Sequence, residues 1–255
     1  MNIFRKLRKQ FAVDNQFLKY ARYAFGEIFL IVIGIFIALQ LNNWNDHRKN
    51  RELEASYYNR ILDDFKMDRA VINTMMGRID KRVETSRTLL LELDQQSKTK
   101  YYILNGLLKA SRSDMFVPLK NTFTDLTSSG NLNILKDIEL KNSLIKYYSD
   151  LENKLLHIKK NREKMVSGQY ALGPVTQIGI YEFDYMQSVL DKEIIDTLAH
   201  VDWHKDPESE YYVNYQNFMI LNIAMNIRIK NHLQIIDQKM ELPFQLLIKK
   251  VNEKE

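Results

Sequence analysis

The residue types best suited to chemistry lie together in one short stretch of the chain. It reads His200-Val201-Asp202-Trp203-His204 and is followed by Asp206. If the stretch is helical, the two histidines stand one turn apart and can bind a single divalent metal ion, with Asp206 as a third ligand. Two histidines at this spacing, without a glutamate motif around them, are a weak metal signal. We therefore expect no metal site here, and instead polar residues on an exposed turn before a helix that begins at Pro207.

Other catalytic chemistry is not encoded in a recognisable form. The chain has no cysteine, which excludes thiol catalysis, disulfide bonds and thiolate metal sites. The motifs G-x-S-x-G and H-E-x-x-H and the phosphate-binding Walker sequence are absent. The sequence thus predicts a protein that is not an enzyme and that uses no cofactor.

An apolar run near the start of the chain is its most informative feature. Residues Ala24 to Leu41 read AFGEIFLIVIGIFIALQL. As a helix they extend about 27 Å, close to the ~30 Å hydrocarbon thickness of a bilayer. Aromatic and polar residues flank the run, as is typical at a membrane interface. The residues predicted at the interface are Arg22, Tyr23, Asn43 and Trp44. We predict a transmembrane helix over residues 23–45; the alternative is a buried helix of a soluble domain.

Charge asymmetry orients this helix. The first 22 residues hold six Lys or Arg and one Asp, so the net charge of +5 lies there and residues 23–255 have none. The positive-inside rule places the N-terminus in the cytoplasm and residues 46–255 in the periplasm. No small-residue cleavage site follows the span, so it reads as an uncleaved signal anchor in the inner (cytoplasmic) membrane. Residues 1–22 form a basic amphipathic segment that favours anionic lipid, and the neutral remainder argues against a nucleic-acid partner.

Three residues inside the span are candidates for contacts between membrane helices. Glu27 is an ionisable group one turn inside the cytoplasmic end; it either faces a protein partner or reaches out to the headgroups. Gly34 and Ala38 form a small-xxx-small pair that lets another helix approach closely. The bilayer, a protein partner and a homo-oligomer formed through the membrane helix or the bundle are the partners that the sequence predicts.

Beyond the span, apolar residues recur at helical spacing and no convincing alternating strand is present. The pattern predicts that the membrane helix continues to Leu93, and that a helix over residues 100–111 and a loop around Pro118 follow. We expect Asn121 or Thr122 to cap a short helix, Asp137 to cap a long one, and Pro243 to interrupt or kink the last. Amphipathic helices of this length must bury their apolar faces against one another. The predicted fold is all-α, with an antiparallel extracytoplasmic bundle over residues 46–255.

The string GEIFLIVIGIFIALQLNNWND, from Gly26 to Asp46, resembles the signature of an uncharacterised family of single-pass membrane proteins of Bacteroidota, the domain-of-unknown-function 6090 family. The segment FTDLTSSGNLNIL, from Phe123 to Leu135, is more loosely similar to the central turn of that family. The resemblance implies membrane topology and architecture but no activity.

Two classes of function remain. The first is a non-enzymatic module in the cell envelope that binds or scaffolds a protein partner, supported by the anchor and the missing catalytic motifs. The second is a periplasmic module that binds a small ligand between its helices and signals through a membrane partner.

Overall fold

The structure is a computed structural model that describes residues 16–93, 95 and 97–253, with side chains from Ala24 onward. Helices alone make up its regular structure within these residues, which confirms the all-α prediction. Residues 1–15 of the predicted basic segment lie outside the described residues. The side chains of Arg22 and Tyr23 lie outside them too.

The first helix, α2 (Gln16–Leu93), is continuous from the apolar run into the following region, as predicted. It is long and apolar enough to cross a membrane, and no residue of its most apolar stretch is buried in the protein. The contacts within the chain divide it into two units, Met1–Ser56 and Tyr57–Glu255. The predicted boundaries at residues 22, 45 and 46 stay predictions.

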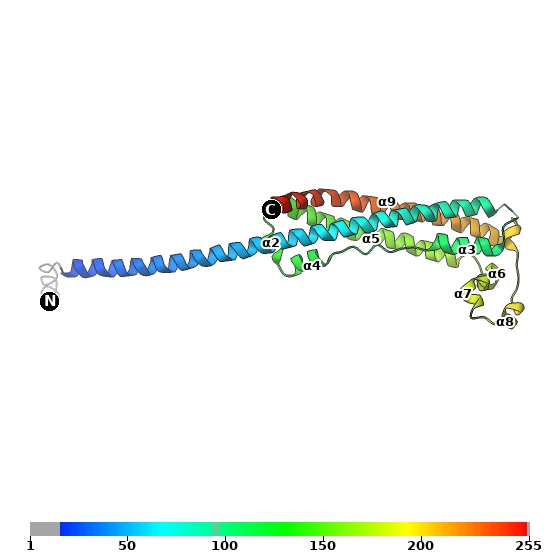
Figure 1. Ribbon diagram of the computed structural model, residues 1–255, viewed down its shortest axis with the longest axis horizontal. Helices are drawn as coiled ribbons and strands as arrows, with labels where there is room; N and C mark the ends of the chain where they lie inside the picture. Colours follow the sequence, from blue (N-terminus) through cyan, green and yellow to red (C-terminus); the bar gives the residue numbers. More distant parts are fainter. Residues whose placement is uncertain (1–15, 94, 96, 254–255) are drawn as a thin grey trace, which may run out of the picture. The chain divides into compact units, whose positions relative to one another are not determined.

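The second unit contains the end of α2 and the remaining elements (Figure 1). In chain order these are α3 (Lys100–Ser111), α4 (Asn121–Ser128), η1 (Asn131–Ile134), α5 (Ile138–Tyr170), α6 (Val175–Ile178), η2 (Ile180–Glu182), α7 (Asp184–Gln187), α8 (Lys192–Thr197), η3 (Trp203–Lys205) and α9 (Glu210–Asn252).

The chain crosses this unit four times in alternating directions. Its first pass is α2 from Tyr57 onward, its third is α5 and its fourth is α9, which packs along α5 (Figure 1). Ion pairs fix the register between the first and fourth passes: Arg69 with Asp237, and Asp80 with Lys230. The partner numbers fall on α9 as they rise on α2, so these two helices are antiparallel.

The second pass is a helix for only part of its length. After the 12 residues of α3, residues 112–120 have no regular secondary structure until α4 begins. Asp114 forms an ion pair with Arg82, and the backbone N–H of Leu119 donates a hydrogen bond to the carboxylate of Asp68. Those partners on α2 are 14 residues apart and span about 21 Å of helix. The five residue-to-residue steps from Asp114 to Leu119 cover about 17 Å when extended but only about 8 Å as a helix. Extended chain therefore replaces part of one helix of the bundle.

The predicted apolar faces form the core. Side chains with 0% exposure come from α2, α5 and α9 alike, and examples are Ile61, Phe65, Leu140, Leu144, Leu233 and Met240. Phe65 on α2 makes an edge-to-face contact with Tyr147 on α5, at 4.9 Å between ring centroids. Burial of these faces is the main force that holds the passes together.

One predicted helix end is confirmed. The carboxylate of Asp137 accepts a hydrogen bond from the backbone N–H of Leu140 at 2.9 Å and so caps α5. At α4, Lys120 and not Asn121 or Thr122 holds the N-cap position, and its side chain makes no capping bond.

Two predictions at the last helix are wrong, its start at Pro207 and its interruption at Pro243; a kink at Pro243 stays a prediction. α9 begins at Glu210 and not at Pro207, because Asp206 accepts a hydrogen bond from the N–H of Glu208 at 3.0 Å and forms a turn there. Pro243 does not interrupt α9, which continues to Asn252. Pro243 is buried, so packing around it offsets the hydrogen bond that its missing N–H removes.

We expect Phe65→Ala to lower the free energy of unfolding by about 3–5 kcal/mol, because it leaves a cavity at the contact between α2 and α5. Met67 is 57% exposed two residues away, and Met67→Ala should change stability by less than about 0.5 kcal/mol. Denaturant unfolding of the detergent-solubilised protein, followed by circular dichroism, measures both. Equal effects of the two substitutions would contradict this packing.

Candidate functional site

An apolar groove of about 760 Å³ runs along one side of α5. One wall is a face of α5 and the other is the extended segment between α3 and α4. The residues that line it are Met115–Pro118, Lys120, Glu152, Leu155, Leu156, Ile158, Lys159, Arg162, Glu163, Val166, Ser167 and Tyr170. A volume of this size is in the range of protein binding sites.

The α5 wall is a second, exposed stripe on a helix whose first stripe faces the core. Leu156, Val166 and Tyr170 are 49%, 41% and 83% exposed. Together with three charged residues they recur at alternating spacings of four and three, in the order Glu152, Leu156, Lys159, Glu163, Val166, Tyr170. This spacing is typical of a helix face that packs against another helix.

The opposite wall follows from the extended conformation of residues 112–120. Phe116 and Pro118 are buried, whereas Met115 and Val117, which alternate with them along the chain, are exposed. A single extended chain is narrower than an α-helix, which is about 10 Å across with its side chains. The groove therefore lies where the bundle has extended chain in place of a helix. The sequence analysis missed this wall; the run Met115 to Pro118, with apolar side chains alternating across an extended chain, was its only signal.

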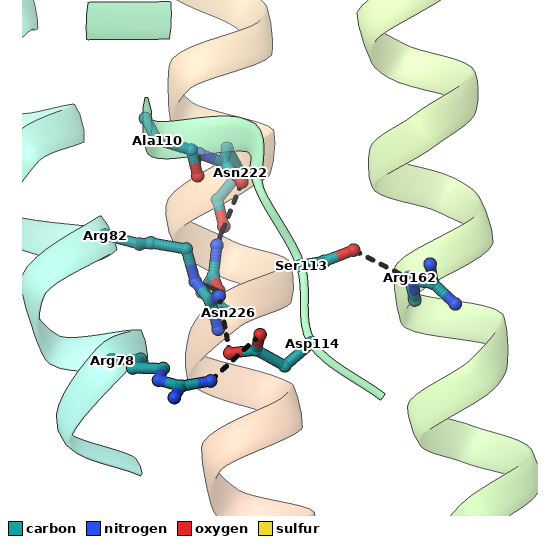
Figure 2. A network of polar contacts seen from close by, with 8 residues as sticks. All are labelled: Arg78, Arg82, Ala110, Ser113, Asp114, Arg162, Asn222 and Asn226. Atoms are coloured by element: carbon teal, nitrogen blue, oxygen red, sulfur yellow. Dashed lines mark hydrogen bonds and ion pairs between the residues drawn. The ribbon is translucent and has the colours of Figure 1, made fainter. Parts of the chain in front are cut away.

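A buried arginine holds the start of the extended segment. The Arg82 side chain, on a residue only 8% exposed, donates from Nε to Oδ1 of Asn226 at 3.2 Å and from Nη1 to Asp114 at 3.2 Å (Figure 2). Arg78 also pairs with Asp114, at 3.3 Å. These contacts join α2, α9 and the segment at one level of the bundle.

Two buried asparagines on α9 extend this network to the end of α3. Nδ2 of Asn226 donates to Oδ1 of Asn222 at 2.9 Å. Nδ2 of Asn222 in turn donates to Oγ of Ser86 at 3.1 Å and to the carbonyl oxygen of Ala110 at 3.0 Å. The network thus fixes the position at which α3 gives way to extended chain.

Arg162 joins the segment to α5 and contributes charge to the groove. Its Nε donates to Oγ of Ser113 at 2.9 Å (Figure 2). The other charged residues of the groove form the ion pairs Lys120 with Glu152 and Lys159 with Glu163. No carboxylate pairs with Arg162 among the residues that the structure describes. Within the described part of the chain, the groove therefore holds one cation, Arg162, that no nearby carboxylate balances.

A buried carboxylate holds the other end of the segment. Both oxygens of Asp68, a residue 3% exposed, accept a hydrogen bond from the N–H of Leu119, at 3.0 and 3.2 Å. Burial raises the pKa of Asp68 from 3.8 to about 6, although the Leu119 hydrogen bond lowers it; neighbouring Asp64 raises it further. The ionised form of Asp68 is therefore less favourable in the folded protein than in water.

The structure separates the two histidines of the candidate metal pair. His204 lies in the 3₁₀-helix η3, and His200 precedes this helix, so one α-helical turn does not join them. Nδ1 of His200 lies 3.0 Å from the hydroxyl of Tyr181. His204 and Trp203 are buried, so the predicted exposed turn is wrong at these two residues. Across the described residues, no group of three His, Asp or Glu is placed to hold a metal ion.

The residues predicted to act in the membrane all lie on α2. Glu27, Gly34, Ala38, Asn43 and Trp44 are exposed, and a Cβ added at Gly34 would meet nothing within 4 Å. Their contacts with lipid or with another helix stay predictions.

Comparison with known proteins gives one family. A family of unknown function (DUF6090) matches residues 27–171, which confirms the family resemblance but not the bacterial group or the single-pass topology that accompanied it. All residues that line the groove fall within this range. No curated protein and no solved structure matches the chain.

The buried carboxylate predicts a specific pH dependence. Because the pKa of Asp68 is higher in the folded than in the unfolded protein, its contribution to stability is present below pH 4 and is lost as the pH rises through about 6. The unfolding free energy of the wild type should therefore fall by at most about 3 kcal/mol between pH 4 and 7 through this group, and Asp68→Asn should remove that fall. The amide oxygen can still accept the Leu119 N–H.

Denaturant unfolding at several pH values measures this difference. The matched control is Asp63→Asn, at an exposed position one turn before Asp68. A parallel pH profile for wild type and Asp68→Asn would contradict the assignment.

Proposed function

This chain belongs to the family of unknown function DUF6090, and for it we propose the role of a non-enzymatic, membrane-anchored helical module that binds a partner protein in the cell envelope. The groove along α5 is the observation that carries this proposal. Its walls are apolar and exposed, and both ends of its extended wall are fixed by hydrogen bonds. A binding surface that is already ordered loses little entropy when a partner binds.

The apolar part of α2 supports the membrane anchor. It has the length and composition of a membrane span, and its large apolar side chains are exposed within the described chain. A contiguous apolar surface of this kind is unfavourable in water and favourable in lipid. The basic residues before it favour a cytoplasmic N-terminus, so the groove faces the periplasm in this proposal.

The anchor predicts resistance to extraction. The full chain should stay in the membrane pellet after an alkaline carbonate wash, and Ile33→Arg should increase release, because a charge at the centre of a span costs about 2.5–3.5 kcal/mol. Met67→Arg, exposed on the same helix beyond the apolar stretch, should have no effect. Complete release of the wild-type chain by the wash would refute the anchor.

The groove predicts a partner contact that depends on its apolar wall. A photoreactive amino acid at Leu156 of the full chain in native membranes should form one defined protein adduct, and the same group at Leu242, exposed on α9, should not. Val166→Asp should lower the yield at least about tenfold, because partner binding would bury an unpaired carboxylate.

Val213→Asp is the matched control, because Val213 is 44% exposed on α9 and Val166 is 41% exposed on α5. The yield at Leu156 should not change in this variant. No adduct at Leu156, or one that survives Val166→Asp, would contradict the proposed function.

A further inference from the structure

The shape of the groove indicates what fills it. Three passes of the bundle, α2, α5 and α9, are helical over most of their length, and the second pass changes to extended chain at residue 112. On the assumption that the proposed function holds, we infer that the groove binds an amphipathic α-helix of a partner protein. That helix packs on the exposed stripe of α5 and supplies the helix that the second pass lacks.

The α5 stripe has the spacing and length for a helical partner. From Glu152 to Tyr170 its residues recur at alternating intervals of four and three, which places them on one face of α5. The stripe covers about 27 Å, which corresponds to about 18 residues of a partner helix. Apolar residues of the partner face Leu156, Val166 and Tyr170.

The charges of the groove specify one further feature of the partner. Arg162 lies between Leu156 and Val166 along α5, and within the described chain its partners are the hydroxyl of Ser113 and the sulfur of Met115 but no carboxylate. An arginine has five N–H donors, so donors remain after the bond to Ser113. The partner helix therefore carries an Asp or Glu opposite Arg162, with apolar residues on both sides.

The same charges argue against a second copy of this chain packed in the same direction. Such a pair would place Lys159 against Lys159 and Glu163 against Glu163, and like charges at contact distance repel. A partner with a different sequence avoids this repulsion.

An extended peptide is the competing occupant. No backbone hydrogen bond from Ser113 to Val117 is present within the described chain, so this segment offers a free edge to a strand. The long stripe on α5 favours the helix, because a strand on that edge would leave much of the stripe uncovered.

The spacing of cross-links separates these occupants. Photoreactive groups are placed at Leu156 and, in a second variant, at Val166 of the full chain in membranes. Mass spectrometry then identifies the partner residue that each one labels. The two positions are about 15 Å apart along α5. A helical partner should be labelled at residues about 10 apart, and an extended partner at residues about 4–5 apart.

Each outcome of this experiment decides a different claim. A separation near ten residues supports the helix. A separation of four or five residues overturns the helix and leaves the proposed function intact. Labelling of this chain's own sequence overturns the claim that the partner has a different sequence. Absence of a groove-dependent adduct at both positions overturns the proposed function itself.

Substitution of Arg162 tests the carboxylate. Arg162→Gln should lower the adduct yield at Leu156 at least about tenfold, because the charge-assisted bond to the partner is lost. Lys160→Gln, exposed on the same helix, should leave the yield unchanged. Circular dichroism of both variants verifies that α5 is intact. An unchanged yield in Arg162→Gln would contradict the inference that the partner carries an acidic residue opposite Arg162.

Discussion

The guanidinium of Arg82 lies among three passes of the bundle, where water reaches it little. A buried charge is costly unless opposite charge and hydrogen bonds surround it, and here Asp114 supplies the charge and Asn226 an acceptor. Asp114 and Asn226 are therefore both held beside Arg82 on α2. Since Asp114 lies three residues beyond the end of α3, this constraint determines where the second pass stops being helical. Removal of Asp114 would leave the buried Arg82 without its half-buried carboxylate partner, so the path of the segment and the charge on α2 depend on each other.

The groove is a consequence of that path. Asp68 holds Leu119 at the far end of the segment, and Phe116 and Pro118 fill the space beneath it. An extended chain is narrower than a helix, so the face of α5 from Glu152 to Tyr170 stays exposed. Exposed apolar surface that polar contacts keep open on a rigid scaffold is typical of a binding site. The proposed role follows from this surface and from the apolar helix that precedes it.

Sequence periodicity predicted the helices well because long amphipathic stripes leave few alternatives. The helix over residues 100–111 and the cap at Asp137 match the structure for that reason. The groove was not predictable in the same way: Leu156, Val166 and Tyr170 occupy the face of α5 that periodicity assigns to solvent, and only the position of residues 112–120 makes them a wall. The exposed turn predicted around the two histidines was wrong for a related reason, since Trp203 and His204 lie buried in a 3₁₀-helix that packs against the bundle. Tertiary contacts between distant segments decide both cases.

The distance across the extended segment tests this account most directly. Because the chain has no native cysteine, Arg112→Cys and Lys120→Cys introduce the only two sites for spin labels. Electron paramagnetic resonance on the full chain in lipid nanodiscs then measures the separation of the labels. The extended segment predicts about 26 Å between the two backbone positions, whereas a continuous helix places them about 12 Å apart. A single population near the longer distance supports the account, and a population near the shorter one would contradict it, because a helical second pass would occupy the groove.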